Sequence, residues 1–244
     1  AKRKTNLKDT DNLVDCSRIR KWKVKGKIVK SRMCARGCFD KQKYLIEKHS
    51  STATRLSQRM ILSIGLLGIM YCDPDDEIDT ESLDISGAFL QGLKYEDLER
   101  LARELGYESR FKRRVHVIPP ENVWRHWRSM ADTPDDLRVE DYERALFVLE
   151  CLRAMYGFVD APLMFQLALL QYLIQECEGQ ASLFDNNYVY WLETTPEHRQ
   201  QQLTLNLTAH VDDLQVTGGQ RRRDWLHAKL EARFGPLKRQ RMPY

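Results

Sequence analysis

The 244-residue sequence lacks a long apolar run, is poor in proline and glycine, and has no cysteine framework of the secreted type. Its longest apolar run, residues 60–72, is 13 residues long, whereas a membrane-spanning helix needs about 20. The 8 prolines and 12 glycines are too few for a collagen-like or low-complexity chain. No apolar segment follows the charged residues 1–4, so no secretory signal peptide is expected. These absences predict an intracellular globular protein with no membrane partner.

The six cysteines also lack the spacing of a metal site. Cys34, Cys38, His49 and Cys72 could be imagined around zinc, but their spacing fits no common ligand pattern. The sequence therefore predicts reduced thiols, the ordinary state in an intracellular protein.

The net charge of +4 conceals a strong asymmetry along the chain. Residues 1–50 hold 16 Lys and Arg against 5 Asp and Glu, and the remainder holds 23 against 30. A basic arm ahead of an acidic body is typical of a protein that binds a polyanion and holds cations elsewhere. We interpret residues 1–12 as a solvated basic tail. In residues 21–36 the charges alternate with apolar side chains, which favours a strand pair with a basic face.

The hydrophobic pattern predicts a mixed α+β fold with antiparallel strands. Strands are expected in six stretches: two within 21–39, then 78–85, 188–193, 203–210 and 214–217. Helices are expected at 54–70, as a buried helix, and at 95–105, 161–177 and 222–234. Residues 107–141 mix basic, Pro and Trp signals and suggest an insertion or a long connection, while 141–155 fits either a helix or a strand.

Two acidic sites stand out from their surroundings. Asp84 ends an apolar strand, and Asp212 and Asp213 lie at the tip of an apolar hairpin. An antiparallel pairing of these strands would place Asp84 beside Asp212, and such close like charges are costly unless a divalent cation lies between them. Ligation by oxygen alone favours Mg²⁺ or Mn²⁺, and two such ions about 3.5–4 Å apart support nucleotidyl transfer. Taken alone, each motif has a plainer interpretation, because Asp is a common turn residue.

Four blocks in order give these acids a context. They are residues 30–37 (KSRMCARG), 83–92 (LDISGAFLQG), 155–162 (MYGFVDAP) and 210–213 (HVDD). This series resembles the reverse transcriptase domain of copia-type long-terminal-repeat retrotransposon polyproteins, and the resemblance covers about residues 20–240. It implies an RNA-directed DNA polymerase that adds dNTPs to a primer 3′-hydroxyl on an RNA or DNA template. It also implies a location in a cytoplasmic particle or the nucleus.

The resemblance further implies a right-hand polymerase with fingers and palm, whose antiparallel palm sheet is backed by helices. Residues 1–78 would form the basic N-terminal arm and fingers. Residues 79–235 would form the palm, with an inserted segment at about 107–141, and 236–244 would be a truncated end. The remainder of the polyprotein (thumb, ribonuclease H, integrase) would then lie outside this chain.

By the same resemblance, three acids match the catalytic centre, and Ile85 and Phe89 match residues that contact the nucleotide. Asp84, Asp212 and Asp213 match the acids that bind two Mg²⁺ or Mn²⁺ ions, and the backbone of Ile85 would lie beside the metal. Phe89 matches the bulky residue that excludes a ribose 2′-hydroxyl, the one local difference between the two sugars.

Five further residues match the nucleotide site. Lys30, Arg32 and Arg36 match the basic segment that would hold the triphosphate. Tyr156 and Gly157 would lie under the incoming nucleotide and the template base, although core packing is an equally good interpretation of Tyr156.

The sequence departs from the family pattern at three positions that bear on activity. His210 replaces a Tyr, and Val159 and Asp160 replace Lys-Gln, which removes a positive charge near the nucleotide and adds a negative one. An alternative is therefore a catalytically silent, diverged retroelement relic that only binds nucleic acid. A metal-dependent phosphohydrolase is a third possibility, for which His210 is the candidate water-orienting group.

Overall fold

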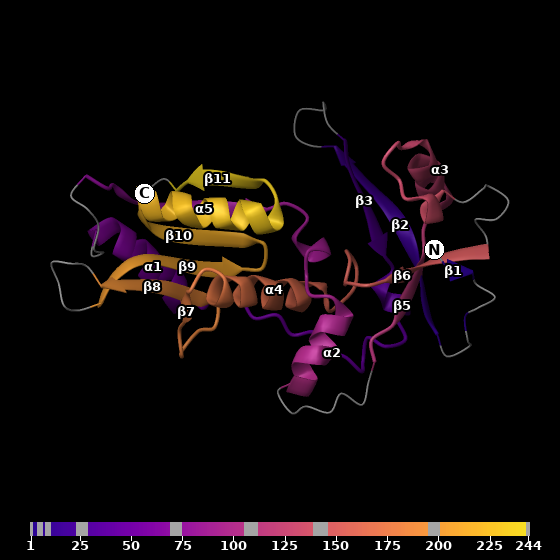
Figure 1. Ribbon diagram of the computed structural model, residues 1–244, viewed down its shortest axis with the longest axis horizontal. Coiled ribbons are helices and arrows are strands. Elements are labelled where there is room, and N and C mark those ends of the chain that lie inside the picture. Colours follow the sequence, from indigo (N-terminus) through magenta and orange to yellow (C-terminus); the bar gives the residue numbers. More distant parts are fainter. Residues whose placement is uncertain are drawn as a thin grey trace. The chain divides into compact units, whose positions relative to one another are not determined.

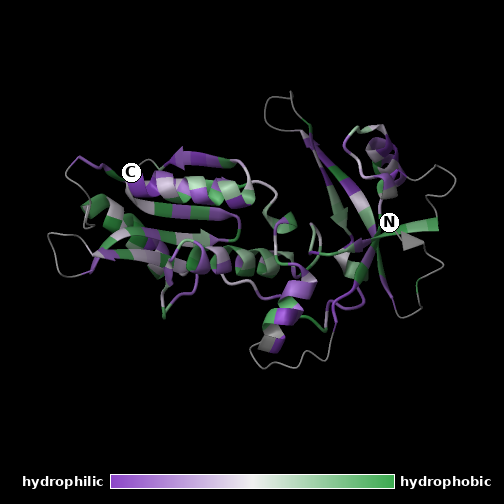
Figure 2. Ribbon diagram, in the orientation of Figure 1, coloured by the Kyte–Doolittle hydropathy of each residue, from purple (hydrophilic) through white to green (hydrophobic). Residues whose placement is uncertain are grey.

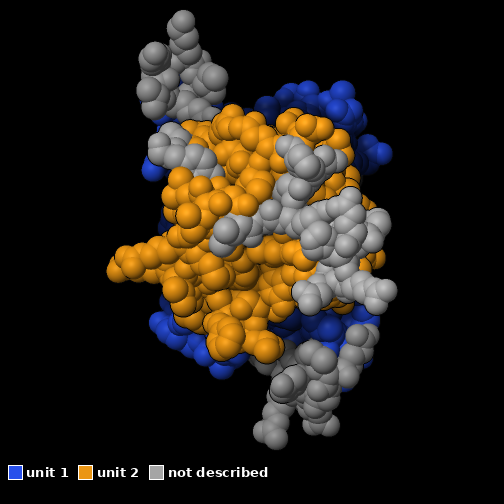
Figure 3. Space-filling view, turned by 90° about the vertical axis from the view of Figure 1, so that its left-hand side faces the viewer, with its two compact units in different colours: residues 1–48, 92–164 blue, residues 49–91, 165–244 orange. Residues whose placement is uncertain are grey.

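The computed structural model describes residues 2–3, 7, 11–22, 29–68, 75–104, 112–138, 146–194 and 201–242. Within these ranges the chain has a mixed α+β fold with five α-helices and two sheets. It divides into two compact units, coloured separately in Figure 3: unit 1 (residues 1–48 and 92–164) and unit 2 (residues 49–91 and 165–244). Each unit is built from two separate stretches of the chain.

Unit 1 is built around a mixed sheet in the order β1-β6-β5-β2-β3 (Figure 1). The strands are β1 (Lys2–Arg3), β2 (Asn12–Trp22), β3 (Val29–Ala35), β5 (Val115–Ile118) and β6 (Phe147–Cys151). β2 is antiparallel to β3 and parallel to β5. Helices α2 (Tyr95–Glu104) and α3 (Glu121–Ser129) belong to the same unit, and Val14, Val115, Val117 and Phe158 are part of its core.

The segment 107–141, expected to be an insertion or a long connection, contributes a strand to the sheet of unit 1. It contains β5, which pairs with β2 and β6 and places Val115 and Val117 in the core of unit 1. This strand has four residues and lies between basic residues and two prolines, so its apolar period is too short to detect. The stretch 141–155, for which the sequence fits either a helix or a strand, contains strand β6. Residues 141–145 lie outside the described residues.

The interpretation of residues 1–12 as a solvated tail is wrong where the structure describes them. Lys2 and Arg3 pair with β6, and Asn12 begins β2 with its side chain 1% exposed. The expected strand pair is present as β2 and β3, although β2 begins nine residues earlier than the predicted stretch 21–39. Residues 23–28, between the two strands, lie outside the described residues.

Unit 2 contains an antiparallel sheet in the order β11-β4-β10-β9-β8-β7. The strands are β4 (Ile78–Ile85), β7 (Gln180–Ala181), β8 (Tyr188–Thr194), β9 (Gln201–His210), β10 (Asp213–Gly219) and β11 (Leu237–Arg241). Three helices accompany the sheet: α1 (Arg55–Leu67), α5 (Gln220–Phe234) and most of α4 (Ala161–Gln175). The predicted strands 78–85, 188–193, 203–210 and 214–217 and the helix 222–234 are confirmed.

The two faces of this sheet differ in polarity. Hydrophobic and hydrophilic residues alternate along β10 (Figure 2), as expected for a strand with one buried face. Leu214 and Val216 pack in the main core with Leu226 and Leu230 of α5 and with α4. Thr217 lies on the opposite face, where its hydroxyl donates to the carbonyl of Ile61 in α1. Helices α4 and α5 therefore back one face and leave polar side chains on the other.

Helix α1 forms as predicted but is not buried throughout. Thr54 caps its N-terminus by accepting a hydrogen bond from the Ser57 N–H, and Gly68 ends it in the left-handed region at φ 59°. Ile61 and Ile64 are buried against the sheet, whereas Leu67 is 69% exposed. No helix within the described ranges is long and apolar enough to cross a bilayer.

Candidate functional site

Strands β4 and β10 bring the predicted acids together. They pair antiparallel with Asp84 directly opposite Asp213, although the two residues are 129 positions apart. Cross-strand partners project from the same face of a sheet. The expected neighbour was Asp212, so the pairing is displaced by one residue from the prediction.

Asp212 lies in the two-residue turn between β9 and β10 rather than in a strand. Its carbonyl accepts a hydrogen bond from the Ile85 N–H at 3.2 Å, which ties the turn to the end of β4. Val211, the other turn residue, has φ 59°. This left-handed conformation is rare for a β-branched side chain, and such strain is found mainly at functional sites.

The three acids form one electrostatic group, which we call the acidic site (Asp84, Asp212 and Asp213). Burial and the negative charges of Asp212 and Asp84 raise the pKa of Asp213 above its ordinary value. Lys238 and His210 act in the opposite direction. The site is therefore one that a cation stabilises.

Lys238 of β11 supplies part of that positive charge. It lies opposite Asp84 in the sheet, and its ammonium group donates to Asp84 Oδ2. Lys238 was not among the predicted site residues, because residues 236–244 were expected to be a truncated end. The run of basic residues at 238–241 was the available signal.

Ion pairs on the other face hold β11 in place. Arg239 binds Glu81, and Glu81 is also bound by Arg223 of α5 at 2.7 Å. Arg241 binds Asp79, which is 2% exposed. Because these carboxylates belong to β4, the pairs fix the register that places Lys238 beside the acidic site.

A polar hollow of about 410 Å³ lies beside Asp213 on the face away from α4 and α5. Besides Asp213 it is lined by Gln58 of α1 and by Ser82, Thr208, His210 and Gln215 of the sheet. Hydroxyl, amide and imidazole groups there can bind a sugar or a phosphate by hydrogen bonds.

The donor atoms of the acidic site are those that Mg²⁺ and Mn²⁺ prefer. Carboxylate oxygens of Asp84 and Asp213 share one face, and the carboxylate of Asp212 adds to the negative charge. In the described part of the chain, no group of three or more His, Cys, Asp or Glu side chains is arranged as a complete metal-binding site. The acidic site therefore has the donor atoms that such a cation needs, on neighbouring strands. In the structure, the Lys238 ammonium group binds Asp84.

Ile85 and Phe89 also belong to unit 2. Ile85 ends β4, and its side chain is 1% exposed in the main core. Phe89 lies in a short 3₁₀ helix, η3 (Ala88–Leu90), and is half-buried against the same core. Ile85 is thus the residue next to Asp84 in β4, and Phe89 lies four residues after the end of that strand.

Of the seven predicted nucleotide-site residues, Ile85 and Phe89 belong to unit 2 and the other five to unit 1. Lys30 and Arg32 are exposed on β3. The Arg32 guanidinium lies over the Tyr156 ring at 4.7 Å from its centroid, a cation–π contact. Arg36 follows β3 and binds Asp15 at 3.2 Å.

Gly157 joins two of the sequence blocks by a close backbone approach. It has φ 97°, and a Cβ atom there would lie 2.0 Å from the Ala35 carbonyl oxygen. The Ala35 N–H donates to the Tyr156 carbonyl at 2.7 Å. A Cβ atom at Gly37 would in turn lie 2.0 Å from the Gly157 carbonyl oxygen, so glycine is required at both positions.

The negative charge that Asp160 adds is buried in unit 1 rather than presented on its surface. Asp160 is 1% exposed and binds Arg113 at 3.2 Å. Arg113 also binds Asp40 at 2.7 Å, and Asn12 donates to the same Asp40 carboxylate. The charge of Asp160 is compensated within unit 1.

The five cysteines that the structure describes form no disulfide. Burial raises the pKa of Cys16 and of Cys151 to about 12, so both are protonated at neutral pH. Of the four residues considered as zinc ligands (Cys34, Cys38, His49 and Cys72), Cys72 lies outside the described residues.

No protein-family model matches the chain, and no curated protein matches its sequence.

Proposed function

We propose that the chain comprises the fingers and palm of an RNA-directed DNA polymerase related to those of copia-type retrotransposons. The observation that carries the proposal is the register of β4 and β10, which sets Asp84 opposite Asp213 beside the strained turn that holds Asp212. Two carboxylates separated by more than a hundred residues meet on the polar face of the sheet, beside the hollow that α1 helps to line. A packing role does not explain this arrangement, because like charges side by side destabilise a fold.

The two faces of the unit 2 sheet support the assignment to a palm. Helices α4 and α5 make one face a hydrophobic base that holds the strands rigid. The opposite face carries the acidic site and the polar hollow beside it. In this proposal the primer end lies in that hollow, where His210 and Thr208 offer hydrogen bonds to its last nucleotide.

The residues of the acidic site would hold two Mg²⁺ ions. Such ions would supply activation of the attacking 3′-hydroxyl and neutralisation of the leaving phosphate. Asp84 and Asp213 would hold the ions from one face of the sheet, and the Asp212 carbonyl keeps the turn against Ile85. Phe89 limits the space for a ribose 2′-hydroxyl. In unit 1, the exposed Lys30 and Arg32 bind the triphosphate.

Primer extension tests this proposal. Purified protein is given an RNA template, a DNA primer, dNTPs and Mg²⁺, and the wild type is compared with Asp84→Asn and Asp213→Asn. Both substitutions should lower extension by about 10²-fold or more, in the range found when one electrostatic group is removed from an active site. Asp135→Asn is the matched control, because its side chain is 99% exposed.

The other outcomes select the alternatives. If the wild type does not extend a primer while salt-dependent RNA binding persists, the chain is a silent nucleic-acid-binding relic. If it hydrolyses dNTPs without a primer and His210→Ala abolishes this, it is a phosphohydrolase. The pairing of His210 with Asp213 makes that outcome worth measuring.

A further inference from the structure

The β2–β3 hairpin carries positive charge on both of its faces. Successive residues of a strand point to opposite faces, and cross-strand partners share a face. Lys21 pairs with Lys30, which places these two on the face that also holds Arg32. Arg20 pairs with Ser31 and Trp22 with Val29, so Arg18, Arg20 and Trp22 lie on the other face. The proposed polymerase function uses the first face and leaves the second without a role.

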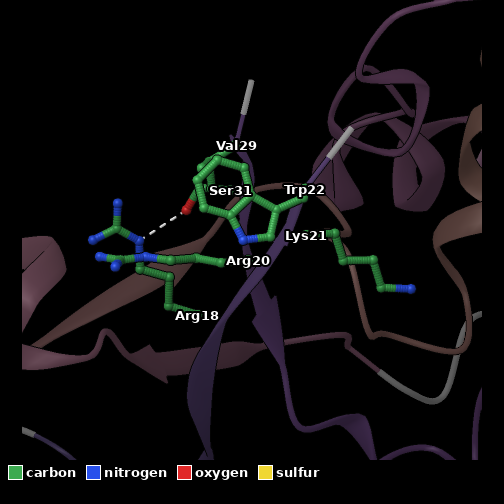
Figure 4. Close-up of a pocket in the computed structure, with 6 residues that line it drawn as sticks. All are labelled: Arg18, Arg20, Lys21, Trp22, Val29 and Ser31. Carbon is green, nitrogen blue, oxygen red and sulfur yellow. Dashed lines mark hydrogen bonds between the residues drawn. The ribbon is translucent and has the colours of Figure 1, made fainter. Parts of the chain in front are cut away.

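Figure 4 shows this second face as a shallow site. In Figure 4 the side chains of Arg18 and Arg20 extend to one side and that of Lys21 to the other. Arg18, Arg20, Trp22, Val29 and Ser31 line the same hollow, and Trp22 is the cross-strand partner of Val29. Arg18 Nε donates to Ser31 Oγ at 2.8 Å, which fixes its guanidinium plane. The hollow they line has a volume of about 460 Å³.

Nothing in the described part of unit 1 neutralises or covers these groups. No carboxylate within the described ranges pairs with Arg18 or Arg20. Trp22 is 71% exposed, which leaves one of the largest apolar side chains in water. Adjacent like charges and an exposed indole each destabilise the free protein, and both are relieved by a ligand that is anionic and aromatic.

We propose that Arg18, Arg20, Trp22 and Ser31 form a second nucleic-acid contact that binds single strands. The arginines bind backbone phosphates as bidentate donors, and the Trp22 indole stacks on an unpaired base. This contact lies on the opposite face of the hairpin from Lys30 and Arg32 and does not depend on the acidic site. Through this contact the chain would bind a single strand whether or not the chain has polymerase activity.

The exposed indole favours a single strand over a duplex. In a double helix the base faces are stacked on one another, so Trp22 could contact only the backbone. Base–aromatic stacking is tolerant of sequence. The site should therefore show little preference among bases and a strong dependence on salt.

Fluorescence anisotropy with a labelled 20-nucleotide poly(dT) strand and with poly(U) tests the proposal. Trp22→Ala should weaken binding by about 5- to 150-fold, the range for loss of one stacked base, and Trp22→Phe should retain most of the affinity. The pair of substitutions Arg18→Gln and Arg20→Gln should reduce the salt slope by roughly 1 to 1.5. Phe184→Ala, which removes an aromatic side chain that is 96% exposed in unit 2, is the matched control and should change nothing.

Three results would overturn the proposal. The first is equal binding by Trp22→Ala and the wild type. The second is a duplex or poly-glutamate that binds as tightly as the single strand, which would indicate a general polyanion surface or a site for an acidic peptide. The third is loss of single-strand binding in Asp213→Asn, which would place the contact at the acidic site. Because the assay involves no synthesis, failure of polymerase activity leaves its result unaffected.

Discussion

Replacing Arg113 with leucine should destabilise unit 1 by about 3–5 kcal/mol, because it leaves buried carboxylates without a counter-charge. The Arg113 side chain is 6% exposed, and those of Asp40 and Asp160 are 0% and 2% exposed. Its guanidinium donates to both oxygens of Asp40, at 3.0 and 2.7 Å, and to Asp160 at 3.2 Å. Two carboxylates thus depend on one cation.

The loss should depend on pH in a defined direction. Burial alone would raise the pKa of Asp40, but hydrogen bonds from Arg113 and Asn12 outweigh it and lower the pKa below the ordinary value. A carboxyl with a depressed pKa contributes stability above its unfolded pKa of about 3.9, and this is lost as pH falls through the folded value. In Arg113→Leu the hydrogen bonds from Arg113 that lower the Asp40 pKa are gone, so burial raises that pKa with much less opposition. The stability difference between the two proteins should therefore shrink as pH falls below about 5.

Urea unfolding, monitored by hydrogen exchange in peptides of unit 1, measures this loss of stability. Arg100→Leu is the control, since Arg100 and its partner Asp97 are exposed and such pairs contribute about 0–1 kcal/mol. A triple variant, Arg113→Leu with Asp40→Asn and Asp160→Asn, should recover part of the loss. The reasoning is refuted if Arg113→Leu costs no more than Arg100→Leu at pH 7.

Three further substitutions test other parts of the structure. Lys238→Gln removes a cation from the acidic site and should tighten Mn²⁺ binding roughly fivefold, measured by electron paramagnetic resonance, whereas Lys229→Gln on α5 should not. Val211→Gly should change the unfolding free energy by less than about 1 kcal/mol, because relief of the left-handed backbone offsets the added chain entropy. Gly157→Ala should cost more than Gly87→Ala in thermal unfolding, since both have positive φ but only the Gly157 site has backbone within 4 Å.

Elements with a clear apolar period could be predicted from the sequence. In unit 2, β9 and β10 alternate between core and polar residues, β4 does so only over its last four residues, and turn chemistry marks the strand ends. The adjacency of Asp84 to the Asp212-Asp213 pair could be predicted as well, because both follow apolar strands. Its one-residue displacement could not, since the turn length that sets the register depends on the left-handed Val211.

Elements held by charge rather than by apolar burial could not be predicted. β11 has the sequence LKRQR and joins the sheet edge through the pairs of Arg239 and Arg241 with acids of β4. Nothing in its local pattern distinguishes it from a solvated basic stretch. Asp160 illustrates the same limit, because its partner Arg113 lies 47 residues away.

Binding of Mn²⁺ to the wild type, Asp84→Asn and Asp213→Asn tests most directly whether the two strands hold a cation together. Electron paramagnetic resonance of free Mn²⁺ gives the dissociation constant for each protein. The account predicts that each single substitution weakens the same site by about 10-fold or more, and that the double variant loses less than the sum of the two losses. Wild-type affinity in Asp84→Asn, with loss in Asp213→Asn alone, would contradict it.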